Sequence, residues 1–237
     1  MRLLDLSLPD AATNLALDEA LLLAAEEADA GEVLRFWEQP TYVVVVGSGG
    51  SVAHDVNIAE CEADGVPVLR RSSGGGTVLL GPGCLCFSLV LGYDHAPGLD
   101  QIRPSNRYVL SRVANALGRV IPATMEGLSD LAVEGLKFSG NSQQRKRNFF
   151  LHHGTLLCGF DLVLVSKYLH APEREPDYRR NRPHAEFVTN LPITPAETKR
   201  LLVAEWQPEG EYEPVPLEKA RELVAEKYSR DEWNRRR

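Results

Sequence analysis

The sequence predicts an α/β protein of the α+β kind, in which helices cover a mixed β-sheet. Short apolar runs rich in β-branched residues, such as 42–46, are interspersed with longer amphipathic patterns without strict βαβ order. The 237 residues are 43% hydrophobic and 25% charged, an ordinary composition for a globular protein with a substantial core. We therefore expect a single domain over residues 1–237.

The order of the elements follows from periodicity and from the residues that end each pattern. A first helix is expected over 14–28, with Thr13 or Asn14 as its N-cap and Gly31 beyond its end. The run at 42–46 is typical of a central strand buried on both faces. Further strands are expected at 33–37, 66–69, 77–80, 84–91, 128–133, 136–138 and 155–158, and further helices at 57–64, 104–117, 161–169, 195–205 and 217–233. The stretch 171–195 is expected to be a long loop. The stretch 139–148 is expected to be a tight turn followed by a basic run, and that run is as compatible with a solvated loop as with a functional role.

Charge and composition limit the possible partners and location. The net charge of -7 argues against a nucleic-acid binder, and no apolar run is long enough to cross a membrane. Asp5, Pro9 and Asp10 interrupt any signal-peptide core, so we expect a cytoplasmic protein. The four cysteines lack zinc-site spacing and are expected to be free thiols, mostly in the core.

The stretch 70–78, Arg-Arg-Ser-Ser-Gly-Gly-Gly-Thr-Val, joins two expected strands. Glycines let a backbone approach a ligand closely, and adjacent guanidinium groups can bind a carboxylate or a phosphate. A hairpin turn with a basic pair on the surface is the alternative. We favour an anion-binding loop. Its candidate ligand-binding residues are Arg70, Arg71, Ser72, Ser73, Gly74, Gly75, Gly76 and Thr77.

Two later stretches are candidates for the rest of a site. Lys137 lies on an expected strand, where an outward-facing surface lysine is the common alternative. The polar residues Ser139, Gly140 and Asn141 follow it directly. The stretch 152–155 is His-His-Gly-Thr. It lacks neighbouring metal ligands, so a hydrogen-bonded structural histidine is favoured there.

The order of these motifs resembles the lipoate-protein ligase family. Arg-Arg-x-Ser-Gly-Gly-Gly, Asp-Leu, Lys-x-Ser-Gly-Asn and His-His-Gly-Thr-Leu-Leu follow one another in that family's sequence order. The resemblance runs from about Asn14 to Leu191 and includes the strand with Trp37. It places the chain in the wider superfamily of biotin and lipoate ligases and octanoyltransferases. It implies a largely antiparallel sheet flanked by helices, like the catalytic domain of those ligases.

The resemblance also implies a reaction. Lipoate, or octanoate, and ATP form an acyl-adenylate, and the acyl group then passes to a lysine of an acceptor lipoyl domain, in a 2-oxoacid dehydrogenase or a glycine cleavage protein. The loop 70–76 would line the lipoyl and adenylate pocket. Lys137 would contact the acyl carbonyl and the α-phosphate, and Asp130 would lie near the phosphates and Mg²⁺. The matching residues Ser139, Gly140, Asn141, His153, Gly154 and Thr155 would complete the substrate site.

The chain departs from the family pattern in three respects. The ligases usually carry His-Asp shortly after the glycine loop, where this chain has Val-Leu-Leu at 78–80. Only 46 residues follow Leu191, so we expect the C-terminal accessory domain of many ligases to be absent or supplied by a partner protein. The positions where related octanoyltransferases carry a nucleophilic cysteine have none here, and Cys84, Cys86 and Cys158 lie on apolar strands.

Two alternatives to the ligase remain at this stage. One is an octanoyl or lipoyl acyltransferase that works through a cysteine thioester, with Cys84 as the first suspect because the turn at 82–83 could expose it. The other is a non-catalytic protein that binds a lipoyl group or its adenylate.

Overall fold

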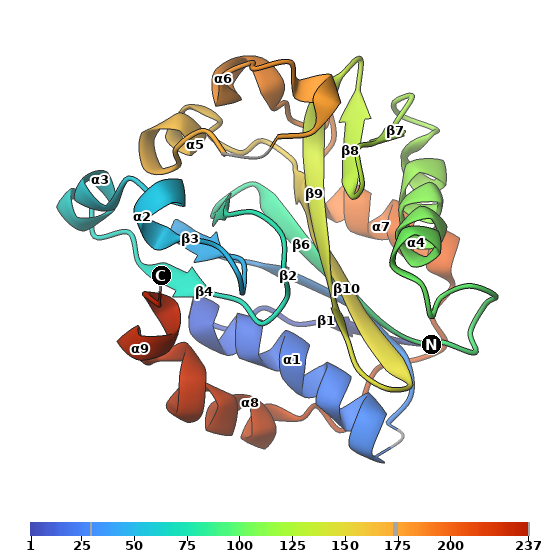
Figure 1. The fold of residues 1–237 in the computed structure, drawn as a ribbon. Helices are drawn as coiled ribbons and strands as arrows, with labels where there is room; N and C mark the ends of the chain where they lie inside the picture. Colours follow the sequence, from blue (N-terminus) through green and yellow to red (C-terminus); the bar gives the residue numbers. More distant parts are fainter. Residues whose placement is uncertain (29, 173–174, 237) are drawn as a thin grey trace.

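Two β-sheets form the framework of the computed structural model, which describes residues 1–28, 30–172 and 175–236 (Figure 1). In these residues, the larger sheet has seven strands in the order β1-β2-β6-β10-β9-β8-β7, and the smaller has the order β4-β3-β5. Neighbouring strands are antiparallel except for β1 with β2 and β3 with β4. The strands are β1 (Arg2–Asp5), β2 (Val33–Glu38), β3 (Val43–Val46), β4 (Val68–Arg70), β5 (Val78–Leu80), β6 (Cys84–Gly92), β7 (Thr124–Glu126), β8 (Asp130–Val133), β9 (Leu136–Arg145) and β10 (Phe149–Leu157). The expected mixed, largely antiparallel sheet is confirmed.

Helices cover both faces of the larger sheet (Figure 1). Helices α1 and α8 pack together on one face, and α4 and α7 pack together on the other. The helices are α1 (Ala11–Ala28), α2 (Val52–Asp55), α3 (Ile58–Ala63), α4 (Ile102–Leu117), α5 (Val163–Tyr168), α6 (His184–Phe187), α7 (Pro195–Trp206), α8 (Leu217–Leu223) and α9 (Asp231–Asn234), with a 3₁₀ turn η1 (Asp177–Arg179) and a π-helical turn η2 (Val224–Tyr228).

Strand β6 is fully buried because it has a hydrophobic core on each side. Its alternate residues Cys84, Cys86 and Val90 face the core below α1, whereas Leu85, Phe87, Leu89 and Leu91 face the core below α4 and α7. Successive side chains of a strand point to opposite faces, so a strand between two cores needs apolar residues at nearly every position. Strand β3 is also buried throughout and is the central strand of the smaller sheet, as expected, but all four of its valines belong to the core below α1.

Helix α1 begins three residues earlier than expected. The carboxylate of Asp10 accepts a hydrogen bond from the backbone N–H of Thr13 at 2.8 Å. Asp10, rather than Thr13 or Asn14, therefore caps the free N–H groups of the first turn. Two acids of this helix, Asp18 and Glu19, are buried instead of facing solvent. Lys227 and the Tyr228 hydroxyl both contact Glu19, at 2.6 Å, and this holds η2 against α1.

Several expected loops and helices are different in the structure. The prediction of a turn at 139–141 and a loop to 148 is wrong, because β9 continues to Arg145 as the partner of β10. The long C-terminal helix breaks into α8, η2 and α9, and the expected loop 171–195 contains η1 and α6. Strands β1 and β7 and helix α2 were not expected. The strands expected at 128–133 and 136–138 are present as β8 and β9 and form a hairpin, with positive φ angles at Glu134 and Gly135.

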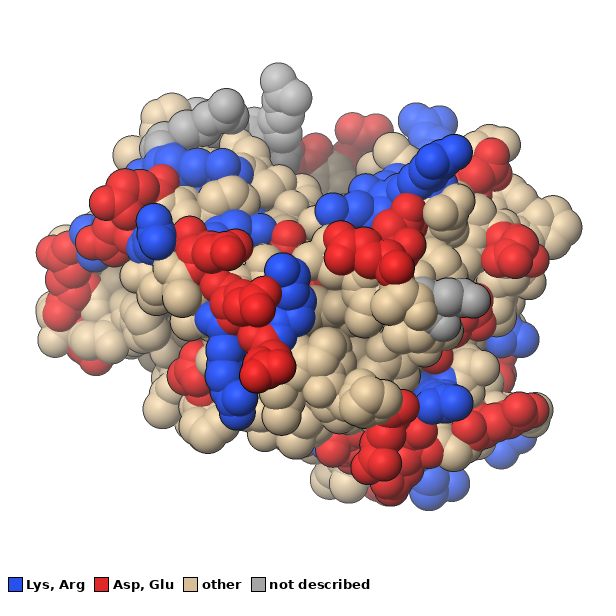
Figure 2. Space-filling model, turned by 90° about the horizontal axis from the view of Figure 1, so that it is seen from below, with Lys and Arg blue, Asp and Glu red and all other residues tan. Residues whose placement is uncertain are grey.

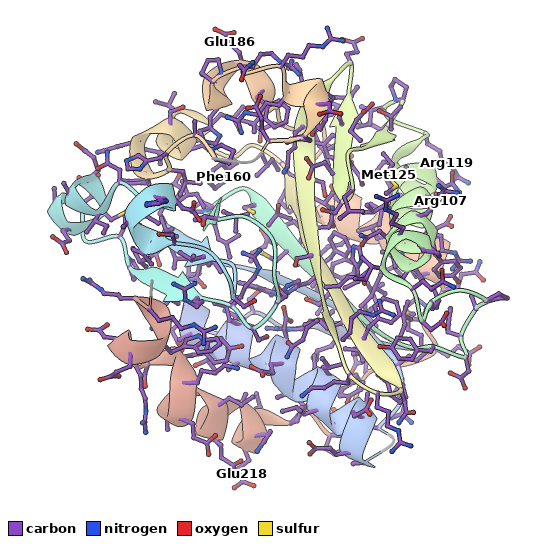
Figure 3. The ribbon with its side chains drawn as sticks, in the orientation of Figure 1. Arg107, Arg119, Met125, Phe160, Glu186 and Glu218 are labelled. Carbon is purple, nitrogen blue, oxygen red and sulfur yellow. The ribbon has the colours of Figure 1, made fainter. Side chains whose placement is uncertain are left out.

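The surface carries mixed charge. Acidic and basic side chains are interspersed over the face shown in Figure 2. In Figure 3, Glu186 and Glu218 project outward at opposite ends of the molecule, whereas Phe160 lies in the interior, 3% exposed. Within the described residues, none of the helices has the length and apolar character needed to cross a membrane.

Candidate functional site

A two-lobed cavity lies between the glycine loop and strands β6, β8, β9 and β10. The first lobe spans about 710 Å³, and its apolar wall is made of Leu15, Trp37, Val45, Leu80 and Cys86. The second lobe spans about 1300 Å³ and runs under η1 and α6 toward α5. Both lobes share the side chains of Thr77, Asp130, Lys137 and Thr155, so they meet at one junction.

Lys137 and Asp130 form an ion pair at this junction. Lys137 Nζ lies 2.8 Å from Asp130 Oδ1, and the Tyr178 hydroxyl donates to Asp130 Oδ2 at 2.8 Å. Burial and the Asp130 carboxylate both raise the pKa of Tyr178, so this phenol stays protonated as a donor. A Cβ at Gly140 would lie 3.0 Å from Lys137 Nζ, so the glycine leaves room for the lysine to reach the junction. The lysine is thus positioned inside the cavity, not on an outward face.

The glycine loop is held by Arg71, which lies inside it. The guanidinium of Arg71 donates to the carbonyls of Val45 at 3.2 Å and Gly76 at 2.8 Å, and to Ser73 Oγ at 3.0 Å. Burial lowers the pKa of Arg71 to about 10, so it remains charged at neutral pH. Since these contacts are internal, Arg71 shapes the loop as well as lining the first lobe.

Arg70 lies outside both lobes, in contrast to the expected ligand contact. It is fully buried, and its guanidinium donates to the carbonyls of Gly47 at 2.9 Å, Gly50 at 2.8 Å and Trp233 at 3.0 Å. The indole N–H of Trp233 donates to the Arg70 carbonyl at 2.8 Å, and Asn234 Oδ1 accepts the Arg70 N–H at 3.0 Å. Arg70 therefore ties the loop after β3 and the C-terminal turn to the end of β4.

The two histidines of β10 have opposite positions because adjacent strand residues face opposite sides. His152 is fully buried and stacks on Phe87, and burial together with His153 lowers its pKa to about 3, so it is neutral. His153 faces the first lobe, with Nε2 2.6 Å from Ser73 Oγ and Nδ1 3.3 Å from Asp18 Oδ2. His152 is structural, and His153 belongs to the cavity.

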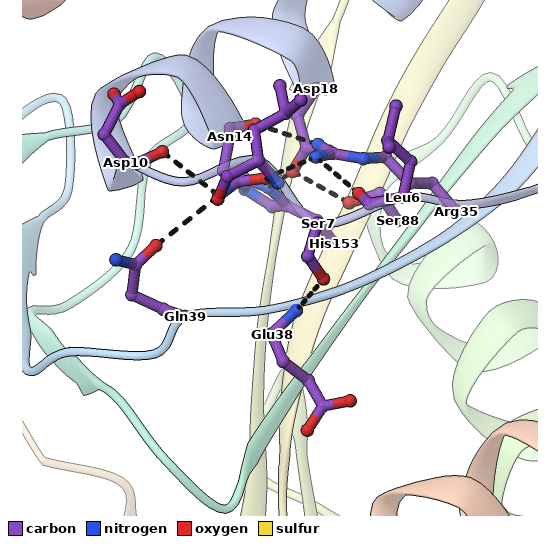
Figure 4. Close-up of polar contacts among 11 residues, drawn as sticks. Leu6, Ser7, Asp10, Asn14, Asp18, Arg35, Glu38, Gln39, Ser88 and His153 are labelled. Carbon is purple, nitrogen blue, oxygen red and sulfur yellow. Dashed lines mark hydrogen bonds and ion pairs between the residues drawn. The ribbon is translucent and has the colours of Figure 1, made fainter.

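Asp18 connects His153 to a buried arginine (Figure 4). Arg35 Nη1 lies 2.6 Å from Asp18 Oδ1, and the Ser88 hydroxyl donates to Asp18 Oδ2 at 2.8 Å. Burial alone would raise the pKa of Asp18, but the Arg35 charge and the hydrogen bonds from His153 and Ser88 outweigh it and hold that pKa below its usual value. This network fixes β10 and the glycine loop to α1.

The remaining predicted site residues are partly brought together. Gly75, Gly76, Thr77, Gly140, Asn141, Gly154 and Thr155 line the first lobe, and Ser139 lines the second. Ser72, Ser73 and Gly74 are not among the lining residues of either lobe; Ser72 bonds Gln144, Ser73 bonds His153, and the Gly74 carbonyl accepts from Ser142.

Sequence reasoning missed the apolar wall and the far wall of the cavity. Leu15, Trp37 and Cys86 looked like ordinary core residues. The pairing of β2 with β6 sets Trp37 opposite Cys86, and Leu15 reaches the first lobe from α1. Arg179 and His184 line the second lobe from the stretch expected to be a loop. The several charged residues within 171–195 were the available sign that this stretch contributes to a site.

All four cysteines are buried free thiols. Cys84 is 1% exposed, so the expectation of an exposed Cys84 is wrong. Burial raises the pKa of Cys86, well above its usual value, and that of Cys158, to about 11. Thiols in such surroundings are poor nucleophiles because the thiolate is the reactive form.

In the described part of the chain, no group of three or more His, Cys, Asp and Glu side chains could hold a metal ion. Mg²⁺ in nucleotide enzymes is usually held by one or two carboxylates together with substrate phosphates. Asp130 and Asp55 are carboxylates of the second lobe that fit this limited role.

A change at Gly75 should weaken ligand binding more than folding. Gly75 has φ +83°, and an added Cβ would lie 3.0 Å from Arg71 Nη2. We expect Gly75→Val to weaken ligand binding at least about tenfold, equivalent to about 1.4 kcal/mol, in calorimetric titration with lipoate, the ligand that the motif resemblance implies. Gly49→Val is the matched control, since nothing lies within 4 Å of its Cβ position. Equal lipoate affinity in the two variants would leave only a turn-forming role for Gly75.

Comparison with known proteins agrees with this architecture. The family model for the lipoyl protein ligase A/B catalytic domain matches residues 10–206. The chain is 35% identical over 156 residues to a probable lipoate-protein ligase A of Mycoplasma pneumoniae, covering 66% of this chain and 45% of that protein. It is 24% identical to the octanoyltransferase LipM of Brevibacillus brevis, over 95% of each.

Two solved structures share the fold. A bipartite lipoate protein ligase of Thermoplasma acidophilum, studied with its E2 lipoyl domain, superposes with a TM-score of 0.84 at 25% identity, over 99% of this chain and 95% of that one. A lipoate-protein ligase A bound with ATP superposes with a TM-score of 0.80 at 25% identity, over 99% and 98%.

Fold and cavity together define an α+β protein with a lysine at the junction of a two-lobed cavity. The chain belongs to the lipoyl protein ligase A/B catalytic domain family. It spans about half the length, 45%, of the Mycoplasma relative.

Proposed function

We propose that this chain is the catalytic domain of a lipoate-protein ligase that activates lipoate or octanoate as the acyl-adenylate. The observation that carries the proposal is the two-lobed cavity with Lys137 at its junction. The apolar wall of the first lobe suits an aliphatic acyl chain, and the second lobe, with Arg179 and His184 in its lining, suits a nucleotide. The similarity to a ligase structure bound with ATP supports the binding of a nucleotide.

The proposed reaction has two steps at the junction. The acyl carboxylate attacks the α-phosphorus of ATP, and pyrophosphate leaves. The amine of an acceptor lysine then attacks the acyl carbonyl, AMP leaves, and the amine loses its proton. Both steps develop negative charge on oxygen, which a fixed cation such as Lys137 stabilises without being consumed. A magnesium ion that enters with ATP would be held by its phosphates and by Asp130.

We propose a lipoyl domain as the acceptor, since the Thermoplasma ligase was studied with such a domain. That ligase is described as bipartite. A separate accessory protein is therefore part of the proposal.

A cysteine acyltransferase is the second candidate, because of the similarity to an octanoyltransferase. The buried cysteines with raised pKa values favour the ligase. We expect the triple variant Cys84→Ala, Cys86→Ala, Cys158→Ala to keep ATP-dependent acyl transfer, with a change in lipoate affinity at most, because Cys86 lines the first lobe. Its free energy of unfolding should fall by a few kcal/mol, about the cost of core truncations.

Intact-mass spectrometry of the wild-type protein tests the two candidates. After incubation with octanoyl carrier protein and no ATP, we expect no covalent adduct. A hydroxylamine-labile octanoyl group on one cysteine would replace the ligase with the acyltransferase.

A further inference from the structure

Arg179, at the end of η1, lines the second lobe but has no role in the site described so far. It is 3% exposed. Its Nε donates to the Arg182 carbonyl at 2.9 Å and lies 3.4 Å from a Glu175 carboxylate oxygen. Its buried Nη2 has no hydrogen-bond partner among the described residues.

An unpartnered guanidinium nitrogen is costly inside a protein. Buried polar groups are nearly always hydrogen-bonded, and leaving a charged donor unsatisfied costs more than leaving a neutral one unsatisfied. A guanidinium presents five N–H donors in a planar fork that matches an oxyanion. An acceptor supplied by a bound ligand would remove this cost.

The segment that carries Arg179 is held in place by its own contacts. The Arg179 guanidinium lies 4.7 Å from the centre of the Phe187 ring, and the Tyr178 and Phe187 rings are 5.1 Å apart. Arg182 Nη2 donates to the Gly135 carbonyl at 2.8 Å, and Tyr178 bonds Asp130. The guanidinium is thus positioned by protein contacts alone, as a preorganised binding group requires.

These contacts also place Arg179 beside the junction. Phe187, under the guanidinium, precedes Val188, which pairs with Lys137 in an isolated β-bridge. Tyr178, which precedes Arg179, bonds the Asp130 carboxylate that pairs with Lys137. The cation is therefore on the side of the second lobe where the reacting groups meet, not at its apolar end near Val165 and Leu169.

We propose that Arg179 is the anion-binding residue of the second lobe and holds a phosphate of the nucleotide. The inference rests on the proposed function, because it takes the second lobe as the nucleotide site. It gives this lobe a second cation besides Lys137. The phosphate would accept from the η nitrogens while Nε keeps its bond to the Arg182 carbonyl.

Calorimetric titration with AMP and with adenosine tests the assignment, because the two ligands differ only in the phosphate. The wild-type protein should bind AMP more tightly than adenosine. In Arg179→Met, AMP affinity should fall about 10- to 100-fold, the range for a hydrogen bond to a charged group, while adenosine affinity stays within about twofold. Arg179→Lys should recover part of the AMP affinity, since it restores charge without the planar fork.

Arg180→Met is the matched control. Arg180 is the next residue along the chain, is exposed and lines neither lobe. It should leave the ratio of AMP to adenosine affinity unchanged. If Arg179→Met also keeps that ratio, whether both affinities are unchanged or both fall equally, the phosphate assignment is wrong and the proposed function stands. If the folded wild-type protein binds neither AMP nor ATP, the nucleotide site and the ligase proposal both fail.

Discussion

Lys137→Ala should lower the rate of acyl transfer by about two to three orders of magnitude, the usual cost of removing a preorganised charge at a reacting centre. Lys137 lies where the two lobes meet, and its ammonium group is 2.8 Å from Asp130. The stability cost should be small, about 1 kcal/mol or less, because the Lys137 side chain is 28% exposed and Tyr178 still satisfies Asp130. Single-turnover measurements with preformed lipoyl-adenylate would isolate the transfer step.

Lys146→Ala is the control for this variant. Lys146 is an exposed lysine at the turn between β9 and β10 and lines neither lobe. Its activity should match that of the wild-type protein. A folded Lys137→Ala protein with near-normal turnover would show that Lys137 has a structural role only.

Arg35→Met should cause the largest loss of stability, about 3–5 kcal/mol, because breaking a buried ion pair leaves an uncompensated charge. Arg35 is fully buried, and besides Asp18 it donates to the Asn14 carbonyl at 2.8 Å. Urea unfolding would measure the effect. Lys219→Met, which breaks an exposed pair with Glu222 at 3.0 Å, should cost less than about 1 kcal/mol. An equal loss of unfolding free energy in the two variants would show that the buried ion pair stabilises the protein no more than the exposed one.

The same pair gives the wild-type protein an acid-dependent stability. The pKa of Asp18 is lower in the folded protein than in the unfolded chain, so the unfolded state binds a proton first. This contribution is complete above about pH 4, the ordinary range for an aspartate, and is lost as the pH falls toward the folded-state pKa. Asp18→Asn should flatten the stability profile below about pH 4. An unchanged slope there would assign the acid sensitivity to other carboxylates.

Local patterns predicted most of the framework. Apolar runs and turn residues suffice for β6 and the hairpin at Glu134, because those elements are determined by burial and turn geometry. Only the end of β10 was expected, at 155–158, and its residues 149–154 were not. The extension of β9 could not be predicted in this way. Its residues 139–145 are polar because they face the cavity and the neighbouring helix α4, where Gln143 bonds Asn106.

The roles of the two adjacent arginines show the limit of motif reading. Both precede the glycines, but Arg70 ends β4 and points to the C-terminal turn, whereas Arg71 turns into the loop. Trp233 and Asn234 complete the surroundings of Arg70 but lie more than 160 positions away, so the sequence near Arg70 does not indicate these contacts. Arg179 was missed for the same reason, since its position depends on Asp130, Phe187 and Val188.

Isotope exchange between pyrophosphate and ATP is the most direct measurement of the central claim. With lipoate, ATP, Mg²⁺ and the purified chain, we expect exchange that depends on lipoate and is lost in Lys137→Ala. It should need no acceptor protein, because adenylate formation precedes transfer; an accessory protein, if one is required, is the only permitted addition. The ligase assignment would be contradicted if exchange were absent both with and without an accessory protein while acyl transfer to a lipoyl domain proceeded without ATP.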